Sequence, residues 1–218
     1  SILTMLGLDE EYKKSSKIYQ EDKINNLIAL DENNPVSIKK SVMMARENAR
    51  GARDSISSDL WGSINRFYHF INSYNEKQLK KDGIYFYTDK VMENCSILEG
   101  YIDNTLVHNE AWALIRMGIH LERATQTARV INSKVKDIQK IGDVKFKESI
   151  ESYHCVTMLK SMEGFDMSRM NYKAVPNMTN ALEFLILKKE FPKSISFNVK
   201  QILDGLNRIS TLKQVESN

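Results

Sequence analysis

The chain has 218 residues, of which 42% are hydrophobic and 27% charged. This balance supports a packed core and excludes a wholly disordered protein. Lys and Arg number 31 against 28 Asp and Glu, and the resulting net charge of +3 is too small to indicate nucleic acid or an anionic membrane as a partner. The two cysteines lack CxxC spacing, which argues against a disulfide framework and a structural zinc site.

The apolar stretches of the sequence are short. The longest strongly apolar one, residues 181–187, is far too short to cross a bilayer. The first residues have no basic leader followed by a long apolar segment, so they do not resemble a signal peptide. We therefore expect a cytoplasmic protein.

Proline is scarce, and each of the three prolines stands where a helix could begin, with Asn34 as a candidate N-cap before Pro35. The segments between the prolines have helical periodicity, and none alternates with period two for long enough to form a sheet. The sequence predicts helices at about residues 17–31, 35–56, 58–79, 88–107, 109–140, 146–160, 176–189 and 192–214. Residues 161–174 are predicted to be a loop. We expect an all-α fold, an up-and-down bundle of about seven or eight helices in a single domain, residues 1–218.

Three predicted helices carry apolar stripes with spacings of three and four residues, which indicate a face packed on a partner helix. The first stripe is Ile38, Val42, Ala45, Ala49, Ala52 and Ile56. The second is Leu114, Met117, Leu121, Ala124, Ala128, Ile131, Val135 and Ile138. The third is Leu60, Ile64, Phe67 and Ile71, after a cap at Ser57 or Ser58.

The sequence also repeats itself once. Residues 27–38 and 184–195 align so that Pro35 matches Pro192 and Ser37 matches Ser194. Both segments consist of an apolar helix end, a polar turn and a new helix. The repeat predicts similar helix pairs at two places in the fold.

Polar side chains follow the stripe residues by one position in all three helices. They are Arg46, Arg50 and Arg53 in the first, Glu122, Thr125 and Arg129 in the second, and Trp61, Asn65 and Tyr68 in the third. One interpretation is a structural ion-pair network, in which Arg50 pairs with Glu47 and Asp54. If Arg50 is buried and paired in this way, Arg50→Ala should lower the free energy of unfolding by about 1–3 kcal/mol. The alternative is a pocket in which the arginines bind a carboxylate or a phosphate.

The sequence gives little support for a metal site, a nucleotide-binding loop or a catalytic nucleophile. A carboxylate-bridged metal site in a helical bundle needs two Glu-x-x-His pairs, and only Glu151 with His154 has that spacing. No GxSxG, Walker or GxGxxG motif occurs. Cys95 and Cys155 lie in predicted helices among apolar neighbours, which favours packing over nucleophilic catalysis.

Two segments, "ARENARGARDSISSDLWGSIN" (45–65) and "GIHLERATQTAR" (118–129), together with the turn "FPKSI" (191–195), resemble the Alpha-E family, an all-helical bacterial domain of unknown function with a Glu-Arg motif. Members of the family usually open with a further helical segment that carries its own Glu-Arg motif. The resemblance therefore implies that this sequence is the later part of a longer protein, which leaves self-association open. Here Gly118 is followed by Ile119 where the family usually has arginine. The positions that match the motifs are Arg46, Glu47, Asn48, Arg50, Arg53, Trp61, Asn65, Glu122, Arg123 and Arg129.

The resemblance also implies a functional setting, because such domains tend to be encoded beside, or fused to, ATP-grasp proteins of a circularly permuted type and transglutaminase-like proteases. The first hypothesis is an accessory domain that works with an ATP-grasp ligase in peptide synthesis or modification. The second is a free-standing enzyme or small-anion-binding protein, with an Arg/Glu pocket between the two motif helices and Glu47 or Glu122 as general acid or base. Neither hypothesis implies a cofactor or a metal.

Overall fold

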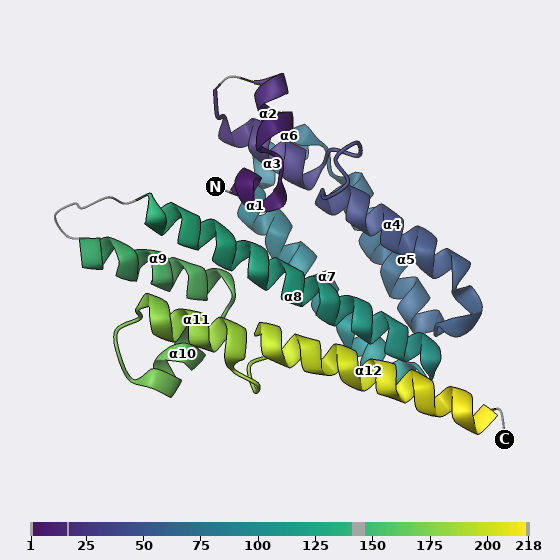
Figure 1. Ribbon diagram of the computed structural model, residues 1–218. Coiled ribbons are helices and arrows are strands. Elements are labelled where there is room, and N and C mark those ends of the chain that lie inside the picture. Colours follow the sequence, from purple (N-terminus) through teal and green to yellow (C-terminus); the bar gives the residue numbers. More distant parts are fainter. Residues whose placement is uncertain (1, 17, 141–146, 217–218) are drawn as a thin grey trace. The chain divides into compact units, whose positions relative to one another are not determined.

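The computed structural model describes residues 2–16, 18–140 and 147–216. These residues form twelve α-helices and one short 3-10 turn, and no strand occurs among them (Figure 1). The all-α class is therefore confirmed, whereas the expected count of seven or eight helices is too low. The helices are α1 (Ile2–Leu6), α2 (Asp9–Ser15), α3 (Glu21–Ala29), α4 (Ile38–Gly51), α5 (Ser58–Ser73), α6 (Glu76–Asp82), α7 (Ile84–Thr105), α8 (Glu110–Gln139), α9 (Lys147–Ser161), α10 (Phe165–Tyr172), α11 (Met178–Leu187) and α12 (Ile195–Glu216).

All eight predicted helices are present, with their ends shifted by a few residues. The additional ones are the short helices α1, α2, α6 and α10. Helix α6 is separate from α5 because Asn75 caps it, accepting a hydrogen bond from the backbone of Gln78 at 3.0 Å. Helix α10 lies inside the predicted loop 161–174, and that loop assignment is wrong.

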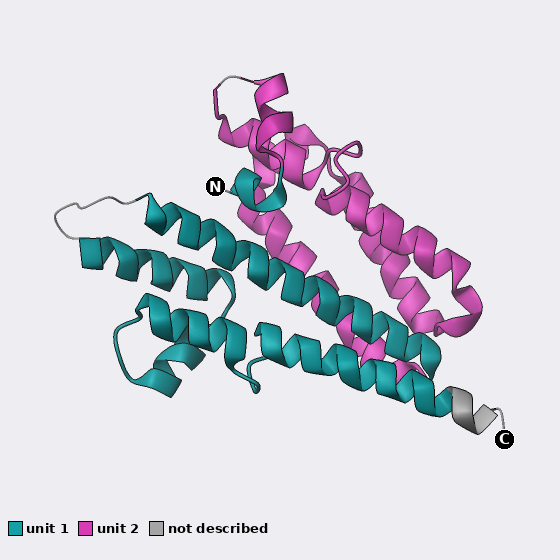
Figure 2. Cartoon of the chain, in the orientation of Figure 1, with its two compact units in different colours: residues 1–7, 109–218 teal, residues 8–108 magenta. Residues whose placement is uncertain are grey.

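The chain forms two compact units, which are described separately (Figure 2). Unit 1 consists of residues 1–7 and 109–218, and unit 2 of residues 8–108. The single domain expected from the sequence stays a prediction.

In unit 2, α5 packs on α4 on one side and on α7 on another. The buried residues of its core are Ala29, Val42, Phe67, Ile71, Tyr74, Leu79 and Tyr87. The third predicted stripe is confirmed here, because Leu60, Phe67 and Ile71 are buried and Ser57 caps the helix.

In unit 1, the long helix α8 packs along α12, and α9, α10 and α11 form the core beside them. The buried residues of that core are Cys155, Met158, Leu159, Met162, Ala181, Phe184, Leu185 and Phe191. The stripe predicted for α8 is confirmed only in part: Met117 faces Gly205 of α12 and Ile131 packs against the core, whereas Leu114 and Leu121 are exposed. The buried residues of α8 are Ala113, His120, Thr127 and Ser133.

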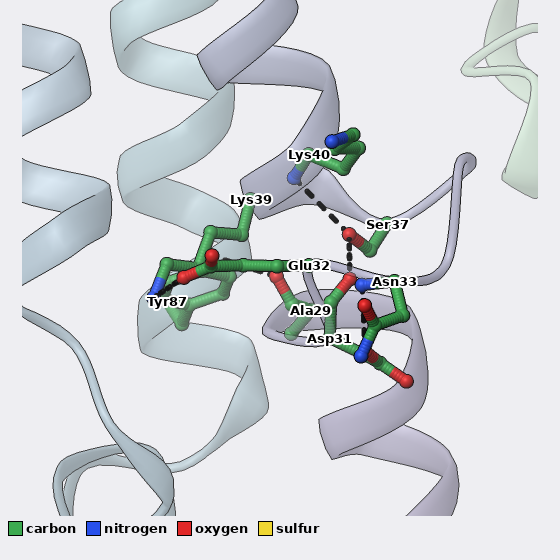
Figure 3. Close-up of polar contacts among 8 residues, drawn as sticks. All are labelled: Ala29, Asp31, Glu32, Asn33, Ser37, Lys39, Lys40 and Tyr87. Atoms are coloured by element: carbon green, nitrogen blue, oxygen red, sulfur yellow. Dashed lines mark hydrogen bonds and ion pairs between the residues drawn. The ribbon is translucent and has the colours of Figure 1, made fainter.

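The turn before α4 is closed by Ser37 (Figure 3). Its hydroxyl donates to the carbonyl of Asp31 at 2.6 Å and accepts from the backbone N–H of Lys40 at 3.1 Å. Its own N–H donates to the carbonyl of Asn34 at 3.1 Å. Ser37 is therefore the N-cap of α4, and the expected cap at Asn34 is wrong, because the Asn34 amide instead donates to the carbonyl of Leu27.

The turn before α12 repeats this pattern around Ser194. The Ser194 hydroxyl donates to the carbonyl of Lys188 at 2.5 Å and accepts from the N–H of Phe197 at 3.1 Å. Its N–H donates to the carbonyl of Phe191 at 2.9 Å. Each of these partners lies at the same sequence offset from the serine as in the first turn. The internal repeat is therefore a repeat of structure as well as of sequence.

Candidate functional site

The first motif block assembles around Arg46 on α4. The Arg46 Nε donates to the Asn65 Oδ1 of α5 at 2.8 Å, and the guanidinium lies over the rings of Tyr68 at 4.5 Å and Trp61 at 5.8 Å. An ion pair with Glu47 at 3.2 Å completes the set. The Asn65 amide is oriented by its own hydrogen bond to the carbonyl of Trp61 at 3.0 Å. Arg46 thus joins α4 to α5 through a planar cation packed between aromatic and amide groups.

The other two arginines of the block lie in different surroundings. Arg50 has 68% of its side chain exposed and pairs with Glu47 at 2.5 Å. Among the described residues the expected pair with Asp54 is not formed. Arg53 is half-buried and donates to the carbonyl of Ile56 and to the Ser58 hydroxyl, each at 3.1 Å. Only Arg50 therefore presents its charge mainly to solvent.

Arg46 is less exposed than Arg50, and its replacement should therefore have the larger effect on the free energy of unfolding. We expect Arg46→Ala to lower the free energy of unfolding by about 1–2 kcal/mol, because it removes ring contacts and leaves the Asn65 carbonyl oxygen without its donor. Arg50→Ala should change stability by less than about 0.5 kcal/mol, since exposed ion pairs contribute little. Urea denaturation followed by circular dichroism measures both values. Equal losses for the two variants would contradict this assignment.

The second motif block lies on α8, in unit 1. Glu122 is exposed, and its carboxylate accepts a hydrogen bond from Gln126 at 2.5 Å. Arg129 is also exposed, whereas Arg123 is half-buried. The two blocks belong to different units, so each is described by itself.

The buried face of α8 contains a polar network that the sequence did not reveal. His120 is 2% exposed, and its Nδ1 lies 2.8 Å from the Oδ1 of Asn198 on α12. Its Nε2 lies 3.2 Å from a guanidinium nitrogen of Arg116. Because arginine can only donate, Nε2 accepts and Nδ1 carries the proton that is donated to Asn198. The histidine is thus held in one neutral tautomer.

Asn198 and Thr127 tie this network to the turn around Ser194. The Asn198 amide donates to the carbonyls of Pro192 at 3.0 Å and Ser194 at 2.6 Å. The Thr127 hydroxyl lies 2.8 Å from the carbonyl of Lys193. Positions 120 and 127 are one heptad apart, and this spacing of two polar residues is the signal that could have indicated a buried polar seam.

Unit 2 contains two adjoining surface cavities, of about 760 and 530 Å³, on either side of α3. Both are lined by Lys23, Asn26 and Glu76, and no residue of the motif blocks is among their lining residues. Tyr74 lines the larger one. Burial, with a hydrogen bond to Asp82 at 2.8 Å, raises the pKa of Tyr74 to about 12, so this phenol stays protonated at neutral pH.

The described residues contain no cluster of three His, Cys, Asp or Glu side chains placed to hold a metal ion. Cys155 is buried in the core, and burial raises the pKa of its thiol. Cys95 is exposed on α7, contrary to the expectation of an apolar environment. None of the described helices has the length and apolar character that a bilayer span requires.

The fold and the motif blocks define an all-helical domain whose ordered polar side chains connect pairs of helices. The chain matches a family model over residues 1–218, and it belongs to the Alpha-E family, described as a predicted alpha-helical domain with a conserved ER motif. The sequence contains one Glu-Arg dipeptide, Glu122-Arg123. No curated protein and no solved structure matches the chain.

Proposed function

We propose that this chain is a helical accessory domain that works with an ATP-grasp ligase in the synthesis or modification of a peptide. The support is membership of the Alpha-E family across the whole chain, together with the setting that the family resemblance implies. Transglutaminase-like proteases are proposed as further partners, and the bacterial cytoplasm as the compartment.

The observation that carries the accessory role is the state of the first motif block. Both carboxylate oxygens of Glu47 are engaged, one by Arg46 and the other by Arg50. Each oxygen keeps further lone pairs, but the two guanidinium groups fix the place of the carboxylate, and Glu47 serves as their shared counter-ion. The block therefore serves better to hold α4 on α5 and to display Arg50 than to move protons.

Arg50 is suited to partner recognition because an exposed guanidinium can form a bidentate pair with a carboxylate. Asn48, two positions earlier, is also exposed but lies on a different face of the helix. A partner surface with carboxylates opposite Arg50 would exchange the Glu47 pair for an interfacial one. We infer that the ligase presents such a surface to α4.

Size exclusion with light scattering tests the proposal. The chain is mixed with the ATP-grasp protein encoded nearest to it, with ATP and amino acids present. We expect a stable complex, and Arg50→Glu should weaken it by about tenfold or more because a reversed charge meets the same carboxylates. Lys77→Glu on α6 is the matched control, since Lys77 is equally a charged surface residue of unit 2. Separate elution of the two proteins would refute the accessory role.

A further inference from the structure

Unit 1 exposes a row of large aliphatic side chains. Leu114 and Leu121 on α8 are 54% and 60% exposed. On α12, Val199, Leu203 and Leu206 are 54%, 56% and 49% exposed. We call these five residues the α8–α12 stripe. An exposed apolar surface of contiguous residues marks an interaction site more often than isolated apolar residues do.

The five side chains lie on one side of the helix pair. Helices α8 and α12 run side by side in opposite directions (Figure 1), and His120 meets Asn198 at their interface. Leu121 and Val199 each follow an interface residue by one position. One residue is a turn of about 100°, and in an antiparallel pair this turn brings both side chains to the same side. Leu114 follows the buried Ala113 in the same way.

Leu206 obeys the same geometry, because it follows Gly205. A Cβ at Gly205 would lie 2.5 Å from the Cγ of Met117 on α8, so Gly205 is also an interface position. Leu203 lies one turn before Leu206 on the outer edge of the stripe. The stripe thus places five exposed aliphatic side chains on the same side of two adjacent helices.

The internal repeat shows what such a surface packs against. Aligning Ser194 with Ser37 matches Val199 with Val42 and Leu206 with Ala49 on α4. Both α4 residues are buried, and Val42 shares a core cluster with Phe67 of α5. The face of α12 that carries the stripe therefore corresponds to the face of α4 that packs on α5.

The third match indicates how the covering helix differs from α5. Leu203 aligns with Arg46, which donates a hydrogen bond to the amide oxygen of Asn65 on α5. Leucine at position 203 cannot pair with an amide, and burying an amide without a hydrogen-bond partner is unfavourable. An apolar side chain is therefore the better neighbour. The covering helix is expected to be more apolar than α5 at the position of Asn65.

We propose that the α8–α12 stripe docks an amphipathic helix of a partner protein, seated as α5 is seated on α4 and apolar where α5 has Asn65. The occupant is a helix, because α5 is the helix on which α4 packs most extensively. This surface lies in the unit that does not contain the Arg46 cluster. It is independent of the proposed ATP-grasp partnership.

A labelled peptide with the sequence of residues 57–75 and the change Asn65→Leu tests this inference by fluorescence anisotropy against the intact chain. We expect saturable binding, tighter than that of the unchanged peptide. Leu203→Glu and Leu206→Glu in the chain should each weaken binding by about tenfold or more, because a charge would be desolvated in the contact. Both positions are half exposed, so the variants should fold, and their circular dichroism spectra verify this.

Leu187→Glu is the matched control, since Leu187 is 62% exposed in unit 1 but outside the stripe. It should bind the peptide as the unchanged chain does. Equal binding by Leu203→Glu and Leu187→Glu would overturn the proposal. So would a dimer of the unchanged chain that Leu203→Glu converts to a monomer in light scattering, because a second copy would then be the occupant.

Discussion

Asn198→Ala is expected to lower the free energy of unfolding by about 2–4 kcal/mol, because a fully buried amide with three hydrogen bonds is lost. Asn198 has no exposed surface. Its removal takes away the hydrogen bond from His120 and the two hydrogen bonds that the amide donates to the carbonyls of Pro192 and Ser194. Urea denaturation followed by circular dichroism measures the loss.

Asn207→Ala is the control for this variant, because Asn207 is an exposed asparagine on the same helix. Its replacement should leave stability within about 0.5 kcal/mol of the unchanged chain, as is usual for surface positions. If the two asparagine variants unfold at the same urea concentration, the buried network does not hold α12 on α8.

Gly205→Leu is expected to destabilise the chain by about 2–3 kcal/mol through overpacking. The reason is the close approach of α12 to α8, where even a Cβ would lie 2.5 Å from the Met117 Cγ and 2.8 Å from its sulfur. Helix propensity alone predicts the opposite sign, since leucine favours a helix over glycine by about 0.8 kcal/mol. The sign of the change in a urea melt therefore decides between the two effects.

A second substitution tests whether the clash with Met117 is the cause. Met117→Ala in the Gly205→Leu background should recover more than half of the loss, whereas Met117→Ala alone should be neutral or destabilising. Additive losses in this double-mutant cycle would show that the strain lies elsewhere.

Helical periodicity was sufficient to locate the long helices, because proline is nearly absent from them and their apolar residues recur every three or four positions. It was misleading about which face of α8 is buried. Leu114 and Leu121 of the predicted stripe are exposed. Helix α8 meets α12 through Met117 of the same stripe and through the polar side chains of His120 and Thr127.

The part of the candidate site that two consecutive helices, α4 and α5, form together could be predicted from the sequence. Spacing placed Arg46 beside one apolar stripe and Asn65 beside another, and these two side chains meet. The same spacing could not separate Arg46 from Arg50, because residues four apart differ by about 40° around a helix and exposure changes over that angle. The heptad spacing of His120 and Thr127 could have indicated a polar seam on α8, but no sequence pattern pairs His120 with Asn198, which is 78 residues away. The ATP-grasp partnership stays a prediction.

The repeated turn is a helix–helix corner with the same hydrogen bonds at two places in the fold. In both copies a proline stands two residues before a serine. The serine hydroxyl donates to a carbonyl six residues back and caps the next helix by accepting from the N–H three residues on. The flanking helices differ in length, in exposure and in what they pack against, so the geometry belongs to the turn itself. Exchanging residues 31–37 with 188–194 should therefore keep a capping serine at both corners but destabilise unit 1, because Asn34 would take the place of the core residue Phe191.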